Sequence, residues 1–409
     1  MPRKPAIGFI FVTLVLDILG IGLIIPILPK LVENFSGGVA EASTNVGLLA
    51  SLYSLMQFIF APILGSLSDR FGRRPVILAS LLGSGLDYFL LAFAPNLTWF
   101  FAGRIIAGVT GANFAAATAY IADISPPEKR AANFGMIGAA FGLGFILGPA
   151  LGGVLGNVGL QIPFLVAGGL TLVNWLYGLF VLPESLSLEN RRAFSWGRAN
   201  PVGSLLALQR HPVAFGLAGT HFLVALGHQV LPATWVLYTS YRYHWTPGQT
   251  GASLAVVGLT VAIVQGGLTR VVVKKMGEAR TAVLGLVVGA LGLVGYGLAT
   301  EGWMIYPILV VASLGGVAGP AVQGLISRGV DANEQGAVQG SLTSLASVAG
   351  IIGPPIATGL FAYFIGTKAP AHLPGAAFFF SALLYVVAMF LALRSFRKNG
   401  LHVPASAKA

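Results

Sequence analysis

Long apolar runs alternate with short polar segments along the whole chain. A helix needs about 20 apolar residues to cross the hydrocarbon core of a bilayer, and runs of that length recur throughout the sequence. The pattern therefore predicts an all-α membrane protein with twelve spanning helices. The predicted spans are 7–29, 45–66, 75–95, 98–122, 134–156, 161–182, 213–238, 250–270, 280–300, 303–327, 340–365 and 374–394.

The distribution of charge supports this topology. Of the 24 Lys and Arg residues, 20 fall in the connections on the side of the N-terminus, three on the opposite side and one, Arg104, inside a span. Basic residues accumulate in cytoplasmic connections, so we expect both termini to be cytoplasmic. Because topology accounts for the net charge of +11, we expect a lipid bilayer and no nucleic acid as partner.

Several kinds of chemistry are missing from the sequence. It has no cysteine, which excludes disulfides and thiolate metal sites. Its six histidines show no HExxH-type spacing, and no Walker-type phosphate-binding motif occurs. We therefore expect no enzyme activity, no metal and no cofactor. Transport driven by an ion gradient, or passive transport, remains.

The sequence repeats itself once, at an offset of 205 residues. The offset places Gly148–Pro149 on Gly353–Pro354 and Gly72 on Gly277. Identity between these positions is low, which indicates an old duplication. Two homologous six-helix halves predict a transporter with a pseudo-two-fold axis and a site between the halves near the bilayer midplane.

The predicted domain organisation follows from this repeat. We expect an N-terminal half at 1–183, a C-terminal half at 213–409 and a cytoplasmic linker at 184–212, which is polar and basic.

The connection at 65–75, GSLSDRFGRRP, is unusually charged for this chain. The offset maps it onto 270–279, RVVVKKMGEA, where Asp69 becomes Lys274. Both copies keep positive charge, as a topology signal requires, but a topology signal alone needs no Asp69. A conformational role for this connection is therefore expected, with topology alone as the alternative.

Three motifs resemble the major facilitator superfamily. The connection at 65–75 is similar to that family's signature loop between helices 2 and 3, through Gly65, Asp69, Arg70, Gly72, Arg73 and Arg74. The fifth span matches the antiporter spacing G-x8-G-x3-GP-x2-GG at Gly135, Gly144, Gly148, Pro149, Gly152 and Gly153. The fourth span carries RIIAG, which resembles the RxxxG signature, at Arg104 and Gly108.

From about residue 10 to 390 the chain is similar to the twelve-helix drug/proton antiporters, and most similar to the tetracycline/proton antiporter branch, as in AYIADI and GAVQGSL. The resemblance implies a monomeric exporter of small molecules in the bacterial cytoplasmic membrane, coupled to protons. It also implies that Asp69 acts as a latch, capping the positive end of a helix in the other half when the transporter faces outward.

Glycines of the fifth span recur every four residues at 144, 148 and 152, so they share one helix face. Small residues at that spacing let two membrane helices approach closely, and Pro149 bends the helix. Ordinary packing explains the pattern. The further expectation is that this packing seals the pore against leak.

Among thirteen acidic residues, only Asp17 and Asp87 fall well inside predicted spans. Such residues are functional candidates by default. Removal from water favours the neutral carboxyl group, and a nearby arginine favours the charged one, so we expect these two acids and Arg104 to couple protons. The alternatives are a static Asp17–Arg104 pair that fastens helices 1 and 4, and contact of Asp87 with substrate.

Polar residues on several spans predict a substrate pocket, although each could instead make a helix–helix hydrogen bond. Tyr53 and Tyr238 are further candidates for its lining. The predicted substrate-binding residues are Gln57, Asn113, His228, Gln229, Trp235, Gln265 and Gln323.

The chain also departs from the tetracycline branch. Where that branch carries an acid on helix 9 and a histidine on helix 8, this sequence has Gly289 and Val261. The second half then has no intramembrane acid, which weakens the case for a tetracycline–metal substrate. Export of amphipathic drugs is therefore the first prediction. Import or facilitated diffusion of a small polar metabolite is the second, and a membrane sensor is a weak third because no soluble domain is present.

Overall fold

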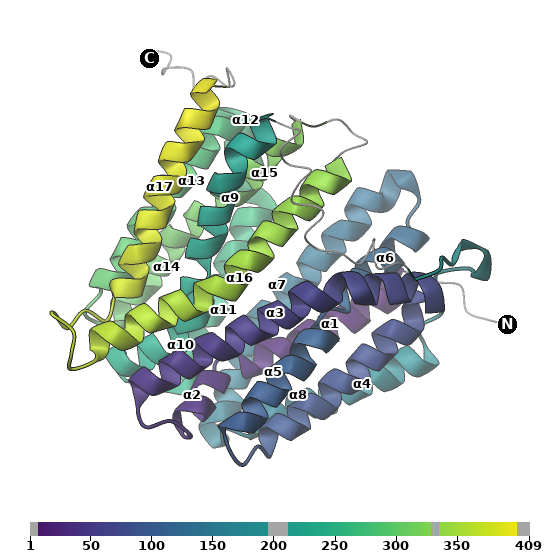
Figure 1. Ribbon diagram of the computed structural model, residues 1–409, viewed down its shortest axis with the longest axis horizontal. Coiled ribbons are helices and arrows are strands. Elements are labelled where there is room, and N and C mark those ends of the chain that lie inside the picture. Colours follow the sequence, from purple (N-terminus) through teal and green to yellow (C-terminus); the bar gives the residue numbers. More distant parts are fainter. Residues whose placement is uncertain (1–6, 195–211, 329, 331–334, 399–409) are drawn as a thin grey trace. The chain divides into compact units, whose positions relative to one another are not determined.

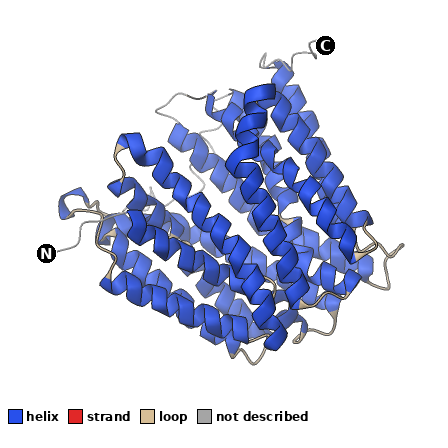
Figure 2. Cartoon of the chain, turned by 180° about the vertical axis from the view of Figure 1, so that it is seen from behind, coloured by secondary structure: helices blue, strands red, loops and turns tan. Residues whose placement is uncertain are grey.

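The computed structural model describes residues 7–194, 212–328, 330 and 335–398. Every regular element in this part of the chain is helical (Figure 2). Twelve helical segments are long and apolar enough to cross a membrane, which confirms the predicted number. They are Ile7–Glu33, Val39–Phe71, Arg73–Ala92, Leu97–Ile124, Asn133–Val158, Ile162–Phe180, Phe215–Tyr243, Pro247–Met276, Glu278–Leu298, Gly302–Ser327, Val338–Ile365 and Ala376–Lys398.

The chain folds into two compact units. Unit 1 comprises Met1–Pro201 and His244–Gly258, and unit 2 comprises Val202–Tyr243 and Leu259–Ala409. Of the predicted linker, residues 195–211 lie outside the described residues.

Unit 1 contains eight α-helices and one short 3-10 helix in its described part up to residue 194 (Figure 1). They are α1 (Ile7–Ile24), α2 (Leu28–Glu33), α3 (Val39–Phe71), α4 (Arg73–Ala92), α5 (Leu97–Gly111), α6 (Phe114–Ile124), α7 (Pro127–Val158), α8 (Ile162–Phe180) and η1 (Leu188–Asn190). The first part of α11 (Pro247–Ile263) also belongs to this unit. A core of aliphatic and small side chains joins α1, α4, α6 and α7.

Unit 2 contains the remaining elements, and its helix α17 lies beside both α9 and α13 (Figure 1). The elements are α9 (Pro212–His228), α10 (Val230–Tyr243), the end of α11, the π-helix η3 (Val264–Leu268), α12 (Thr269–Met276), α13 (Glu278–Leu298), η4 (Gly302–Met304), α14 (Ile305–Leu314), η5 (Gly315–Val317), α15 (Ala318–Arg328), α16 (Gln335–Ile365) and α17 (Ala376–Lys398).

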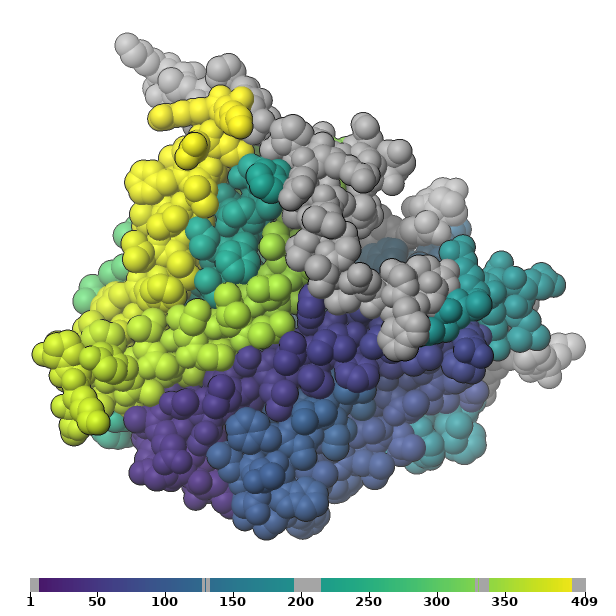
Figure 3. Space-filling view, in the orientation of Figure 1, coloured from purple at the N-terminus to yellow at the C-terminus, as the bar shows by residue number. Residues whose placement is uncertain are grey.

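Helix α17 shows which solvent these helices face. Its yellow side chains are exposed on the face of unit 2 that Figure 3 shows. Large apolar side chains of α17 are among the exposed ones, with Leu383 58% and Phe390 61% exposed. Large apolar side chains at that exposure are stable in lipid and unfavourable in water. The exposed face is therefore the one expected of a helix in a bilayer.

Several spans are interrupted where the sequence predicted continuous helices. The fourth span breaks at Ala112–Asn113 between α5 and α6, and the tenth passes through η5. The seventh breaks at Gln229, and the eighth widens into η3. Such irregular turns are frequent at functional sites.

The internal repeat is visible in the backbone. Gly72 and Gly277 both have positive φ, at 106° and 78°. Each glycine ends one helix by donating its N–H to the carbonyl four residues earlier, Ser68 or Val273, and each precedes the first residue of the next helix. The two turns are thus equivalent, as the sequence offset predicts.

Candidate functional site

A cavity of about 160 Å³ lies within unit 1, between α1, α3, α4 and α5. One part of its wall is apolar, formed by Ile21, Ile24 and Ile25 near the end of α1. The other part carries all three charged residues that the sequence places inside spans. The polar lining residues are Asp17, Tyr53, Ser84, Asp87, Tyr88 and Arg104.

Arg104 forms its ion pair with Asp87, at 4.0 Å between Nη2 and Oδ2. The alternative of a static pair between Arg104 and Asp17 is not observed among the described residues. Both partners are buried, with side chains 9% and 1% exposed, and the guanidinium carbon lies 5.8 Å from the centre of the Tyr53 ring. In the described part of the chain, Nε of Arg104 donates no hydrogen bond and Oδ1 of Asp87 accepts none. These polar atoms are therefore buried without a hydrogen-bond partner among the described residues.

Asp17 projects from the middle of α1 and is 6% exposed. Its Oδ2 accepts a hydrogen bond from Nδ2 of Asn113, at 3.4 Å. Asn113 lies in the break between α5 and α6, so this interruption brings a polar side chain to the carboxylate. The cavity therefore holds two buried carboxyl groups and one guanidinium.

Helices α1 and α7 approach each other through the glycines of the fifth span. A Cβ atom on Gly148 would lie 2.5 Å from Cα of Gly22, and one on Gly144 or Gly152 would collide with Ile18 or Leu23. The predicted shared face is confirmed, and it packs against the helix that carries Asp17.

The other motif positions differ in their surroundings. A Cβ on Gly153 would lie 2.6 Å from the carbonyl oxygen of Pro247, so Gly153 packs against the start of α11. Gly135 has nothing within 4 Å of the position of a Cβ atom. Pro149 lies within helix α7, and a Cβ atom on Gly251 would collide with its carbonyl oxygen. Close packing therefore requires glycine at four motif positions but not at residue 135.

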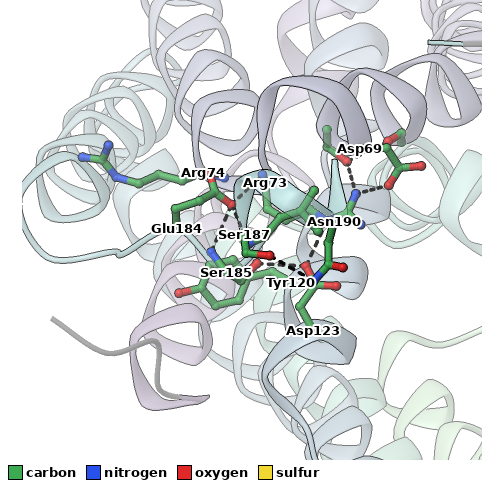
Figure 4. Close-up of polar contacts among 12 residues, drawn as sticks. Asp69, Arg73, Arg74, Tyr120, Asp123, Glu184, Ser185, Ser187 and Asn190 are labelled. Carbon is green, nitrogen blue, oxygen red and sulfur yellow. Dashed lines mark hydrogen bonds and ion pairs between the residues drawn. The ribbon is translucent and has the colours of Figure 1, made fainter. Parts of the chain in front are cut away.

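The connection between α3 and α4 is held by a cluster that we call the loop clasp, formed by Asp69, Arg73, Arg74, Asp123 and Glu184 (Figure 4). The Glu184 carboxylate accepts the backbone N–H groups of Arg73 and Arg74, at 2.9 and 3.2 Å. It thereby caps the start of α4, where Gly72 offers no side chain. An acid at a helix N-terminus also interacts favourably with the helix dipole.

The Arg73 side chain occupies the centre of the loop clasp. Its Nη1 donates to Asp69 and to Ser68, and its Nε donates to Asp123 at 3.1 Å. The Asp69 carbonyl accepts the backbone N–H of Arg192 at 3.0 Å. The described start of the predicted linker is thus bound directly to this connection.

The remaining members of the signature loop make local contacts. The Gly65 carbonyl accepts the Ser68 hydroxyl at 2.7 Å, and the Arg70 guanidinium lies 5.0 Å from the Phe71 ring centre. A cap by Asp69 on a helix of the other half stays a prediction.

Sequence reasoning missed Glu184 and Asp123. Each acid follows an apolar run on the same predicted side of the membrane as residues 65–75. The useful signal was the uncapped helix start after Gly72, which needs an acceptor from another segment.

Comparison with known proteins places these features in a family. The family model of the Major Facilitator Superfamily matches residues 10–354 and 217–407. The chain belongs to the Major Facilitator Superfamily. It is therefore a transporter and an integral membrane protein, and not an enzyme.

Individual relatives place the chain more closely. It is 42% identical to the class C tetracycline resistance protein of Escherichia coli, covering 95% of this chain and 96% of that protein. It is 37% identical to the class H protein of Pasteurella multocida, covering 97% and 98%. Among solved structures, the human organic anion transporter MFSD10 matches with a TM-score of 0.70 at 26% identity, covering 95% and 100%. The chain thus falls in the tetracycline-resistance branch of the superfamily.

The predicted substrate residues divide between the units, and no contact tests their role. In unit 1, the Gln57 amide donates to the Tyr53 hydroxyl at 2.9 Å, beside the cavity. In unit 2, Gln323 donates to Gln339 at 2.8 Å, and Gln265 is exposed on the π-helix η3.

Two further candidates flank the break in the seventh span. His228 is exposed at the end of α9, and Gln229 packs against Gly353. Trp235 is 1% exposed and packs edge-on against Tyr296, which is the environment of a core residue. The shared pocket of these side chains stays a prediction.

Proposed function

We propose that the protein is a proton-coupled antiporter that exports small amphipathic compounds by alternating access. The observation that supports this proposal is the charge balance of the unit 1 cavity, which is lined by two buried carboxyl groups and one guanidinium. Arg104 neutralises one of them, Asp87. The second, Asp17, is buried in the cavity wall, and its hydrogen-bond partner among the described residues is the Asn113 amide, so we assign proton exchange to this acid.

The cavity lining supports an amphipathic substrate. Isoleucines of α1 present an apolar wall, while Tyr53, Ser84 and Arg104 present hydrogen-bonding groups opposite. If the protein binds substrate at one membrane face and a proton at the other, the two cross the membrane in opposite directions, which is antiport. The similarity to tetracycline resistance proteins supports export of drug-like molecules.

The glycine packing and the loop clasp have complementary roles in this proposal. Contact of Gly148 with Gly22 seals α1 against α7, so that protons and solutes do not leak beside Asp17. The loop clasp fixes one end of α4, the helix that carries Asp87, and Asp69 biases the conformational equilibrium without contacting substrate.

We also propose the membrane arrangement of the chain. Two repeated halves, 1–183 and 213–409, are joined by a linker at 184–212, and both termini are cytoplasmic in a monomer of the bacterial inner membrane. The chain has no cysteine, so a single cysteine introduced at residue 195 can be treated with an impermeant thiol reagent in intact cells. Labelling from outside would contradict the proposed topology.

The test of function is substrate-dependent proton movement in liposomes that contain a pH dye. Tetracycline with Mg²⁺, metal-free tetracycline and ethidium serve as probes. Parent protein should move protons with at least one probe, and Asp17→Asn should reduce that movement to the level of protein-free liposomes. Glu41→Gln is the matched control, because this carboxyl group is exposed and outside the cavity. Undiminished flux in Asp17→Asn would exclude this residue and direct attention to Asp87 or His228.

A second candidate function rests on unit 2. No acid lies in the interior of its membrane spans, where Glu278 stands only at the first position of the ninth, and Gln265 and Gln323 are exposed. Neutral amides suit a polar, uncharged solute, so import or facilitated diffusion of a small polar metabolite is the alternative. Uptake of a radiolabelled nucleoside or sugar without effect of the three drug probes would favour it.

A further inference from the structure

Asn113 occupies an unusual position in the fourth span. It is the residue immediately before α6, where asparagine normally accepts a hydrogen bond from a backbone N–H of the first helical turn. Here its side chain makes no such cap, and its backbone is helical, with φ −61° and ψ −20°. The amide is directed instead toward Asp17, to which Nδ2 donates at 3.4 Å.

The second polar atom of this amide is unused. Asn113 is 5% exposed, and its Oδ1 accepts no hydrogen bond from the described residues. A buried acceptor without a donor is costly, so its position beside a carboxyl group needs an explanation.

The chemistry of the two groups provides one. An ionised carboxylate only accepts hydrogen bonds, whereas a protonated carboxyl group also donates one, and a carboxamide can do either. Arg104 can only donate. The hydroxyl groups of Tyr53 and Tyr88, which line the same cavity, can also donate or accept, but among the described residues the hydrogen bond to the Asp17 side chain comes from Asn113. Asn113 is therefore the bonded partner that suits both protonation states of Asp17.

We propose that Asn113 is a positioning residue for proton exchange at Asp17 and not a substrate ligand. When Asp17 is ionised, Nδ2 of Asn113 donates to it, as observed. When Asp17 binds a proton, the amide rotates by half a turn and Oδ1 accepts from the new O–H group. Asp17 can therefore gain and lose its proton while both its ionised and its protonated form keep a hydrogen bond to Asn113. This inference rests on the proposed proton coupling and assigns a second residue to it.

A matched control exists one turn earlier along α1. Asn174 of α8 is also fully buried, its Nδ2 donates at 2.9 Å to the carbonyl oxygen of Thr13, and its Oδ1 is likewise unpaired in the described part of the chain. Both asparagines therefore attach a neighbouring helix to α1, but only Asn113 reaches a carboxyl group. A purely structural role would make the two positions equivalent.

The experiment compares Asn113→Leu, Asn113→Thr and Asn174→Leu in liposomes, using the drug probe that gives the largest proton flux with the parent protein. Leucine has nearly the shape of asparagine and no polar atom, while threonine keeps one donor and one acceptor. Asn113→Leu should lose proton-coupled transport by about tenfold or more, since both the ionised and the protonated form of Asp17 then lose their Asn113 hydrogen bond. It should retain exchange of labelled probe for unlabelled probe. Asn113→Thr should keep most of the coupled rate, and Asn174→Leu should not separate the two activities.

Infrared difference spectroscopy of the purified protein across a pH titration gives a readout that needs no substrate. The carboxyl band that disappears in Asp17→Asn should move to higher wavenumber in Asn113→Leu and stay in place in Asn174→Leu. Equal proton flux in parent and Asn113→Leu, or a parallel loss of flux and exchange, would overturn the inference and leave the proposed function intact. Absence of proton flux in the parent with every probe would refute both.

Discussion

Replacement of Gly72 by alanine tests the loop clasp, because the repeat supplies its own control at Gly277. Both glycines have a backbone that only glycine adopts readily, with φ, ψ of 106°, 158° and 78°, 162°. Their surroundings differ. A Cβ on Gly72 would collide with the Glu184 carboxylate and lie 3.0 Å from Nη2 of Arg191, whereas a Cβ on Gly277 has nothing within 4 Å.

The expected magnitudes follow from these surroundings. The backbone strain is common to both variants and costs about 1–3 kcal/mol. Gly72→Ala must also displace Glu184 from the N–H groups of Arg73 and Arg74, and loss of a helix cap costs about 0.5–2 kcal/mol. Gly72→Ala should therefore be the more destabilising of the two by about 0.5–2 kcal/mol.

A double-mutant cycle isolates the second contribution. The free energy of unfolding is measured by SDS titration in mixed micelles for the parent, Gly72→Ala, Glu184→Ala and the double variant. Once Glu184 is truncated, the collision and the cap are both absent, so Gly72→Ala should cost only as much as Gly277→Ala. The summed losses of unfolding free energy in the two single variants should then exceed the loss in the double variant by about 0.5–2 kcal/mol. Additive costs, or equal costs for Gly72→Ala and Gly277→Ala in the parent, would refute this account of the loop clasp.

Two further predictions concern other parts of unit 1. Gly148→Leu should abolish transport, because the leucine side chain has no room against Gly22. Gly142→Leu on the same helix should transport at the parent rate, because nothing lies within 4 Å of a Cβ atom at that position. Equal transport rates of the two variants in liposomes would contradict the packing argument. Asp69→Asn should slow transport by about fivefold or more and leave equilibrium binding of the probe unchanged. The reason is that Asp69 contacts Arg73 and does not line the cavity. Transport at the parent rate would mean that this connection is a topology signal only.

The number of spans could be predicted because the thickness of a bilayer fixes the length of each apolar run. Their ends were less predictable. The second span begins at Val39 and the eighth ends at Met276, beyond the predicted 45 and 270. A helix that leaves the hydrocarbon core keeps its own backbone hydrogen bonds, so it continues into polar residues without an apolar signal.

The breaks in the spans were not predictable from hydropathy. Residues Ala112 and Asn113 continue an apolar run with a single polar side chain, and the local sequence gives no strong stop signal. The interruption is coupled to a contact with Asp17, 96 positions away in the sequence. Such tertiary contacts override local helix preference.

The charged residues of the cavity were predictable as a group but not as pairs. An intramembrane charge needs a polar partner, which brings Asp17, Asp87 and Arg104 to one place. The true partner of Arg104 follows from the hairpin between α4 and α5, which turns at about residues 93–96. Asp87 and Arg104 lie at similar distances from this turn, so two antiparallel helices place them side by side.

The proposed proton site has no charged counterpart in the second copy of the repeat. At the repeat offset, Asp17, Asp87 and Arg104 correspond to Phe222, Gly292 and Leu309, none of which can carry charge. Leu309 is fully buried, and a Cβ on Gly292 would collide with Ala312. These positions of the second copy are therefore used for helix packing.

The loop clasp shows the same asymmetry. Arg73 and Glu184 correspond to Glu278 and Met389, so the second copy keeps the strained glycine of the turn but not the residues that bind around it. A backbone conformation required by the turn is retained in both copies, whereas the counterparts of Asp69, Arg73 and Glu184 are Lys274, Glu278 and Met389, so the loop clasp is found in one copy. If proton coupling needs only one set of carboxyl groups, restoring charge to the second copy should not improve it. Gly292→Asp should therefore destabilise the protein through its collision with Ala312 and leave the proton flux per transported probe unchanged. An increased proton flux per probe in liposomes would show that the second copy retains a latent coupling site.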